Sequence, residues 1–267
     1  MQVVILCGGM GTRIRDVADD IPKPMIPIGG RPILWHIMKG YAHYGFKRFI
    51  LCLGYKSWAV KQYFLNYALA SSDLSVELDC VDAVTVKEPY RLEDWQVTLA
   101  ETGLETMTAG RVKRVQKYLE GDHFLLTYGD GVSDVNLHHL VDFHVQQGKL
   151  GTVTAVKPPG RFGEIDVAGG EVVEFNEKPL ATQGLINGGF FAFHRRFVER
   201  LPDRDDLVLE RDPLMQLAHE RQLAAYVHGG FWHCMDNSRD YHLLNQLWAG
   251  GAAPWAAGAG AARRRAA

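Results

Sequence analysis

The sequence has few cysteines, little net charge and no long apolar run, and each absence argues against a class of protein. Its four cysteines lie far apart, so we expect reduced thiols in a cytoplasmic protein rather than a zinc site or a redox pair. A net charge of −2 argues against a nucleic-acid-binding protein, because such proteins usually carry an excess of basic residues. No apolar run is long enough to span a membrane, and no signal peptide is expected, because the N-terminus enters a predicted strand directly.

Two common phosphate-binding motifs are missing as well. The Walker loop requires Gly-Lys-Ser/Thr, and no such triplet follows the first glycines of this chain. The dinucleotide fingerprint fails at one position, because its third glycine would fall where Ile14 stands. Any phosphate site near the N-terminus must therefore be built in another way.

A glycine-rich stretch follows the first apolar run, residues 3–6, which is typical of a buried strand. The stretch reads Gly8-Gly9-Met10-Gly11-Thr12-Arg13, so several backbone amides can point at one polyphosphate while the arginine adds positive charge. Lys23 then stands between two prolines, which stiffen the backbone on both sides of a cation. The alternative is a tight turn with solvated charges. The rigid lysine favours a phosphate site.

Strands and helices alternate in the first part of the sequence. Apolar patterns predict a helix from Pro32 to Gly45, a buried strand over 48–53, and a further helix carrying Val60 and Phe64. Repeated strand–helix units are typical of a parallel sheet with helices on both faces. A chain of 267 residues with 47% hydrophobic content can bury one such α/β core, with or without a small appendage. Ligands of these sheets bind at the carboxyl ends of the strands, where the glycine-rich loop lies.

Asp130 lies between two glycines after the strand-like run 123–128, in the same layer as the predicted phosphate site. Its structural alternative is a turn aspartate that bonds its own backbone. Mg²⁺ commonly takes one or two carboxylates together with phosphate oxygens, and the nearby phosphate site favours that role. Asp236 precedes a helix predicted to begin near Ser238, so the pattern alone also allows an N-cap.

The segments LCGGMGTRIRD and PKPMIPIGGRPILWHIM resemble the signature of the sugar-nucleotide pyrophosphorylases, which are nucleotidyltransferases. Within that family the chain is most similar to the cytidylyltransferases that act on glucose 1-phosphate, and the resemblance ends near Trp255. It implies a Rossmann-like open mixed sheet, mostly parallel, with a small β-rich sugar-binding part. It also implies transfer of a cytidylyl group from CTP to a sugar 1-phosphate with Mg²⁺ as cofactor, in a homo-oligomer. We expect a domain over 1–249 and a flexible tail over 250–267.

The resemblance assigns roles residue by residue. Catalytic roles fall on Arg13, Lys23, Asp130 and Lys178. Nucleotide contacts fall on Leu6, Gly8, Gly9, Gly11, Thr12, Arg13, Lys23, Thr108, Gly110, Arg111 and Asp130. Substrate contacts fall on Tyr128, Gly163, Glu177, Lys178, Asn187 and Gly188, and metal ligands are Asp130 and Asp236. Ala109 replaces a glycine of the nucleobase segment. Alternatives that remain open are another nucleotide or acceptor, and a sensor that binds nucleotide sugars without turning them over.

Other polar stretches have simpler interpretations. His138, His139 and His144 share a predicted helix over 137–147, but their spacing points them in different directions, so we expect packing or surface roles, with His144 in the core. The charged stretch 87–94 has three possible interpretations: a mobile loop, an oligomer contact or a solvated face.

Overall fold

The computed structural model describes residues 1–9, 14, 20–79, 84–89, 92–158, 164–168, 171–176 and 184–256. In residues 88–89, 164–168 and 171–176 only the backbone is described.

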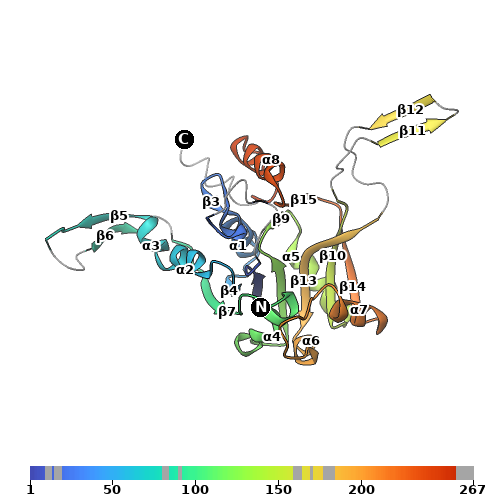
Figure 1. Cartoon of the computed structure of the whole chain (residues 1–267), viewed down its shortest axis with the longest axis horizontal. Coiled ribbons are helices and arrows are strands. Elements are labelled where there is room, and N and C mark those ends of the chain that lie inside the picture. Colours follow the sequence, from blue (N-terminus) through green and yellow to red (C-terminus); the bar gives the residue numbers. More distant parts are fainter. Residues whose placement is uncertain are drawn as a thin grey trace.

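A seven-stranded sheet forms the centre of the described structure, in the order β14-β10-β13-β8-β1-β4-β7 (Figure 1). The strands are β1 (Gln2–Leu6), β4 (Arg48–Leu53), β7 (Gln96–Glu101), β8 (His123–Tyr128), β10 (Gly151–Val156), β13 (Ile186–His194) and β14 (Leu223–His228). Neighbours are parallel except where β13 pairs antiparallel with β8 and β10. The predicted sheet, mixed and mostly parallel, is therefore confirmed.

Helices cover both faces of this sheet, as predicted. The described helices are α1 (Ile33–His43), α2 (Ser57–Leu65), α3 (Tyr67–Ala70), α4 (Thr108–Arg114), α5 (Leu137–Gln147), α6 (Arg196–Arg200), α7 (Asp212–His219) and α8 (Ser238–Ala249), with 3-10 turns η2 (Lys23–Met25) and η3 (Gln116–Tyr118). Because side chains alternate along a strand, the side chains of β1 pack into two hydrophobic cores, one on each face of the sheet. Val3 and Ile5 pack with α1, α5 and α8, whereas Val4 and Leu6 pack with α4, α6 and α7.

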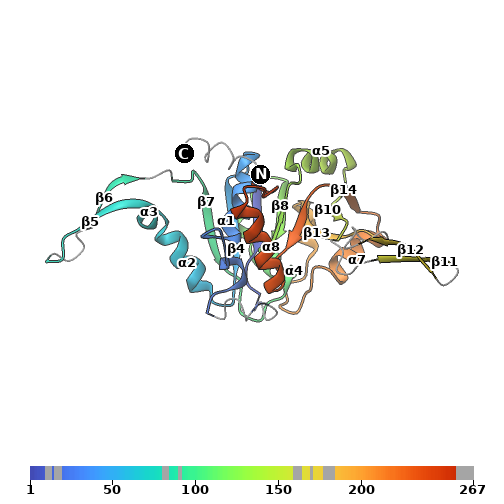
Figure 2. The same cartoon turned by 90° about the horizontal axis from the view of Figure 1, so that it is seen from above.

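Four two-stranded ribbons complete the described structure. They are β2 (Pro27–Ile28) with β3 (Arg31–Pro32), β5 (Ser72–Val76) with β6 (Val84–Pro89), β9 (Gly131–Ser133) with β15 (Trp232–Cys234), and β11 (Glu164–Ala168) with β12 (Glu171–Asn176). Figures 1 and 2 show β5–β6 as an arm that extends away from the sheet. The strands of the β11–β12 hairpin pair antiparallel.

Two smaller predictions can be compared with the packing. His144 is buried on α5 and bonds Thr152 Oγ1 and His123 Nδ1, so its predicted core role is confirmed. Trp255, within the predicted tail, is buried against Phe231, and residues 257–267 of that tail lie outside the described residues. In the part of the chain that is described, no helix has the length and apolar content needed to cross a membrane.

Candidate active site

The β9–β15 ribbon brings two distant aspartates together. Asp130 directly precedes β9, and Asp236 follows β15 after Met235. The two strands pair antiparallel, with Cys234 opposite Gly131, and the Met235 amide donates to the Asp130 carbonyl at 2.9 Å. A backbone ladder therefore sets the relative position of two carboxylates that are 106 positions apart in the numbering.

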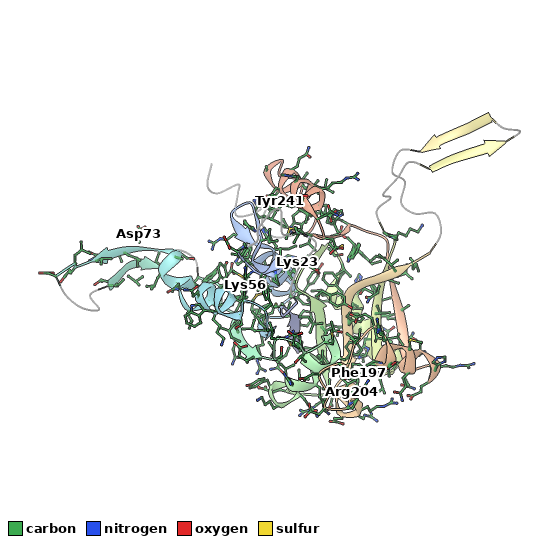
Figure 3. The ribbon with its side chains drawn as sticks, in the orientation of Figure 1. Lys23, Lys56, Asp73, Phe197, Arg204 and Tyr241 are labelled. Carbon is green, nitrogen blue, oxygen red and sulfur yellow. The ribbon has the colours of Figure 1, made fainter. Side chains whose placement is uncertain are left out.

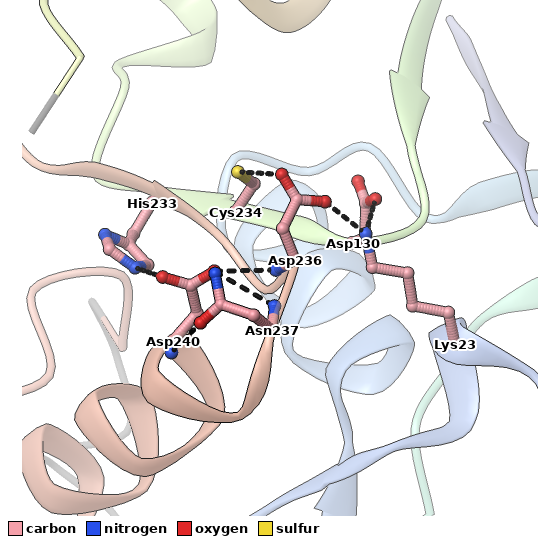
Figure 4. A network of polar contacts seen from close by, with 7 residues as sticks. All are labelled: Lys23, Asp130, His233, Cys234, Asp236, Asn237 and Asp240. Carbon is pink, nitrogen blue, oxygen red and sulfur yellow. Dashed lines mark hydrogen bonds and ion pairs between the residues drawn. The ribbon is translucent and has the colours of Figure 1, made fainter. Parts of the chain in front are cut away.

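Lys23 reaches both carboxylates. Its Nζ lies 2.6 Å from Asp130 Oδ2 and 2.6 Å from Asp236 Oδ1 (Figure 4). Burial alone would lower the pKa of the ammonium, but the two carboxylates outweigh it and raise the pKa above its ordinary value. The side chain is only 14% exposed, and Figure 3 shows Lys23 in the middle of the molecule. The lysine is therefore charged, and in this structure its ammonium lies between the two carboxylates.

The backbone of Asp236 is fixed by the start of α8. Asn237 is the N-cap and accepts from the Asp240 amide, while Asp240 Oδ2 accepts from the amides of Asp236 (2.9 Å) and Asn237 (3.1 Å). His233 Nε2 lies 3.0 Å from Asp240 Oδ1. The N-cap alternative for Asp236 is therefore wrong: Asn237 takes that role, and the Asp236 carboxylate faces Lys23.

Cys234 contacts the second oxygen of that carboxylate. Its thiol donates to Asp236 Oδ2 at 3.2 Å. Burial, followed by the negative charge of Asp236, raises the pKa of the thiol to about 12. The cysteine is therefore a neutral donor beside the site and not a nucleophile.

A cavity of about 450 Å³ opens beside Lys23 at the carboxyl ends of β1 and β8. Its lining is Leu6, Cys7, Gly8, Gly9, Lys23, Pro24, Thr106, Met107, Thr108, Arg111, Tyr128, Gly129, Asp130 and Asp236. Nine of these residues were named from the sequence as site residues. The structure thus brings the predicted nucleotide loop, the lysine and both acids to one place.

Arg111 also lines the cavity, but its guanidinium is engaged with the protein. Nη1 donates to the carbonyls of Leu53 and Gly103 and to Thr102 Oγ1, and Nη2 donates to the carbonyls of Gly8 and Leu104. The side chain therefore ties the ends of β1, β4 and β7 to the glycine loop. Its predicted contact with nucleotide stays a prediction.

The rim of the cavity joins the predicted nucleotide and sugar regions. The Tyr128 hydroxyl donates to Glu210 and accepts from Asn187 Nδ2 at 3.2 Å. Thr108 Oγ1 donates to the other Glu210 oxygen at 2.9 Å. Glu210 thus bridges Thr108, predicted for nucleotide, and Tyr128, predicted for sugar.

Several predicted residues lie elsewhere. A Cβ on Gly110 would meet the Arg204 carbonyl at 2.8 Å, so this glycine packs against the 204–205 loop and not into the cavity. The Gly188 carbonyl accepts from Trp232 Nε1 at 2.6 Å, away from the cavity lining. Six further site residues fall outside the described residues: Gly11, Thr12, Arg13, Gly163, Glu177 and Lys178.

Some residues of the site were not predicted. The pattern Asn237-x-x-Asp240 before an apolar helix is a capping signal and could have identified Asp240. Glu210 has no local signal, because it lies in an irregular segment and meets Tyr128 across 82 positions. Cys7, Thr106 and Met107 also line the cavity. Their only sequence signal is that they lie close to predicted site residues in the chain.

The donor set suits a hard divalent cation. Asp130 and Asp236 each place one oxygen 2.6 Å from the same ammonium, so the two carboxylates converge on one point. No cluster of three or more histidine, cysteine or acidic side chains arranged for a metal occurs among the described residues. Two carboxylates without a complete protein cage are what Mg²⁺ uses when phosphates and water supply its other ligands.

Comparison with known proteins gives one consistent result. The model of the nucleotidyl transferase family matches residues 2–243. The glucose-1-phosphate cytidylyltransferase of Salmonella typhimurium is 47% identical over 256 residues, covering 96% of this chain and 98% of that protein. The "Probable glucose-1-phosphate cytidylyltransferase" of Bacillus subtilis is 42% identical over 255 residues, covering 96% and 99%.

Solved structures share the fold at lower identity. HddC from Yersinia pseudotuberculosis complexed with GMP-PN aligns with a TM-score of 0.66 at 24% identity, covering 92% of this chain and 99% of that one. The inositol-1-phosphate CTP transferase from T. maritima aligns with a TM-score of 0.58 at 16% identity, covering 92% and 95%. These likenesses show the architecture alone.

Proposed function

The chain belongs to the nucleotidyl transferase family, and we propose that it transfers a cytidylyl group from CTP to α-D-glucose 1-phosphate, giving CDP-glucose and pyrophosphate. Two relatives at 47% and 42% identity that match over nearly their whole length are named for this reaction, which supports the choice of base and sugar. The observation that carries the proposal is Lys23 held between Asp130 and Asp236 beside a cavity at the carboxyl ends of β1 and β8.

The reaction forms one bond to phosphorus and breaks another. An oxygen of the sugar phosphate attacks the α-phosphorus of CTP in line, and the bond from that phosphorus to the β-phosphate oxygen breaks as pyrophosphate leaves. The attacking phosphate is largely a dianion near neutral pH, so no strong general base is required. The barrier comes mainly from repulsion between two anions and from charge growing on the leaving oxygen, which fixed positive charge and positioning lower.

The described residues can supply that stabilisation. Asp130 and Asp236 would hold Mg²⁺, which when bound neutralises charge on the nucleotide phosphates. Lys23 would neutralise the α-phosphate, and Gly9 lines the same cavity. From the sequence we assign the departing pyrophosphate to Arg13 and the amides up to Thr12.

The sugar half of the site is proposed on two grounds. Lys178 and Glu177 are assigned from the sequence to the sugar phosphate and the sugar hydroxyls, and both lie outside the described residues. Tyr128 and Asn187 are in hydrogen-bond contact with each other at the rim, which supports their assignment to the sugar.

Pyrophosphate release tests the function directly. The wild-type chain should be assayed with each of CTP, UTP, dTTP and GTP against glucose 1-phosphate, mannose 1-phosphate and inositol 1-phosphate, with and without Mg²⁺. We expect the highest kcat/KM for CTP with glucose 1-phosphate, and little release without Mg²⁺. A higher value for another pair would reassign the substrates, and binding of CDP-glucose without turnover by any pair would identify a sensor instead.

We also propose a homo-oligomer in the cytoplasm. In the β5–β6 arm the register pairs Leu74 with Val86 and Val76 with Val84, so four exposed apolar side chains share one face of a two-stranded ribbon. A second copy of the chain would cover that face. Cys7, Cys52 and Cys234 are free thiols, which suits a reducing compartment.

Sedimentation measures the assembly. Leu74→Ser with Val86→Ser should lower the oligomer mass while far-UV circular dichroism stays unchanged, and Ser75→Ala on the opposite face should behave like wild type. A wild-type chain that sediments as a monomer at micromolar concentration would contradict the proposal.

A further inference from the structure

Lys23 makes two ion pairs with the oxygens best placed to bind a metal. Its Nζ is 2.6 Å from Asp130 Oδ2 and 2.6 Å from Asp236 Oδ1 (Figure 4). The three side chains are 14%, 29% and 25% exposed, so the contacts are screened less than surface pairs. One ammonium thus occupies the point on which both carboxylates converge.

Asp236 and the backbone of Asp130 have contacts that do not involve Lys23. Asp236 is fixed through its own amide by Asp240, and its Oδ2 accepts from the Cys234 thiol. The Asp130 carbonyl is tied to the Met235 amide across the ribbon. The Asp236 carboxylate therefore cannot turn away without losing the Cys234 contact, and the backbone position of Asp130 does not depend on Lys23.

Lys23 has a rigid base and a flexible side chain. Its backbone is fixed in η2, where the Met25 amide donates to the Pro22 carbonyl and the Ile26 amide to the Lys23 carbonyl. The four-carbon stem can rotate, and Lys23 itself lines the cavity of about 450 Å³. The ammonium can therefore move from the carboxylates into the cavity while its backbone stays in place.

We propose that Lys23 and a divalent cation compete for Asp130 Oδ2 and Asp236 Oδ1, so that a metal arriving with the nucleotide displaces the ammonium toward the phosphates in the cavity. This deepens the proposed function and rests on it for the identity of the nucleotide. The exchange keeps the two acids neutralised throughout, because one cation replaces another. It also couples two events, since the phosphates that accept the ammonium favour the entry of the metal.

A consequence is that the metal alone binds weakly. Without a nucleotide, the cation must displace an ammonium whose ion pairs, among the described residues, are with these same two carboxylates. Removing the ammonium should therefore strengthen metal binding even though it removes a group needed for turnover. An ordinary binding or structural lysine would not show this opposite pair of effects.

Manganese binding to the full-length chain, measured without nucleotide by the electron paramagnetic resonance signal of free Mn²⁺, tests the competition. Lys23→Met and Lys23→Gln should each bind Mn²⁺ roughly tenfold more tightly than wild type or better, which corresponds to about 1.4 kcal/mol. Two substitutions are used so that a folding defect in one, which circular dichroism detects, leaves the other as the test. Lys47→Met removes the same charge from the exposed pair with Asp94 and should leave the Mn²⁺ affinity unchanged.

A double variant locates the bound ion. Adding Asp236→Asn to Lys23→Met should abolish the gain in affinity. Folded Lys23 variants that bind Mn²⁺ no more tightly than wild type would overturn the competition, as would a gain that survives Asp236→Asn. These outcomes do not depend on the nucleotide and sugar assay. If wild type turns over CTP but the Lys23 variants bind Mn²⁺ no more tightly, the proposed function stands and the competition is refuted. If the Lys23 variants bind Mn²⁺ more tightly but no substrate pair is turned over, the competition stands and the proposed function is refuted.

Discussion

Gly8 and Gly9 are neighbours in the sequence, but substitution by alanine should affect them very differently. A Cβ on Gly8 would lie 2.1 Å from Arg111 Nη1 and 2.3 Å from its Cζ, whereas a Cβ on Gly9 would meet no atom of the described residues within 4 Å. Neither glycine has a positive φ, so the difference comes from space and not from backbone strain. Gly8→Ala should therefore disturb packing, and Gly9→Ala should not.

The cost at Gly8 follows from what Arg111 does. The guanidinium must retreat by more than about 1 Å to reach an ordinary contact distance. It is buried and makes five hydrogen bonds, so it cannot retreat without losing some of them. Two lost bonds to a charged donor are worth about 3–6 kcal/mol. Alanine restricts the unfolded chain and returns about 0.4–1 kcal/mol, which leaves a loss of about 2–5 kcal/mol.

Denaturant unfolding followed by circular dichroism measures this loss. Gly9→Ala is the matched control and should change the free energy of unfolding by about 0.5 kcal/mol in either direction. Gly9→Ala is expected to act on nucleotide binding instead, through KM for CTP. Equal stability losses in the two variants would refute the reasoning, because they would mean that Arg111 does not pack against Gly8.

Four further predictions concern the site and the core. Lys23→Ala should lower kcat roughly 10²–10³-fold with the fold intact by circular dichroism, and near-normal turnover would remove Lys23 from catalysis. Asp240→Ala breaks the capping box and releases the Asp236 amide, so it should cost about 1–2 kcal/mol in urea unfolding and also weaken Mn²⁺ binding, whereas Asp142→Ala on the exposed face of α5 should do neither. Tyr128→Phe should raise KM for the sugar phosphate about fivefold, the effect of one lost hydrogen bond, while KM for CTP stays the same. Burial, followed by the charges of His123 and His194, lowers the pKa of His144 from 6.5 to about 4, so its neutral form stabilises the fold above pH 6.5 and that contribution is lost as pH falls toward 4. Unfolding of His144→Gln should therefore depend less on pH in this window than unfolding of wild type or of the exposed variant His139→Gln.

Local patterns in the sequence predict the elements well. The apolar run at 3–6 and the repeated strand–helix units indicate parallel strands with helices on both faces, and β1, α1 and β4 form close to where the pattern places them. Such signals depend on neighbours a few residues apart, because the periods of a helix and a strand are short. Ile14 likewise ruled out the dinucleotide fingerprint without any structure.

The two glycines show where local signals end. Both were assigned to nucleotide binding, and both do line the cavity. Only the fold places Arg111, from a helix about a hundred positions later, directly behind Gly8 and away from Gly9. The same holds for Asp236, because its N-cap alternative is excluded only by the capping bonds of Asn237 and Asp240.

The sequence by itself determined the class of fold, the buried first strand, the glycine-rich loop and the stiffened lysine, because each depends on residues that are adjacent in the chain. Only the tertiary structure decided that Lys23 meets Asp130 and Asp236, across separations of 107 and 213 positions. Those separations are closed by the parallel pairing of β1 with β8 and by the β9–β15 ribbon, and no local pattern sets the register between such distant strands.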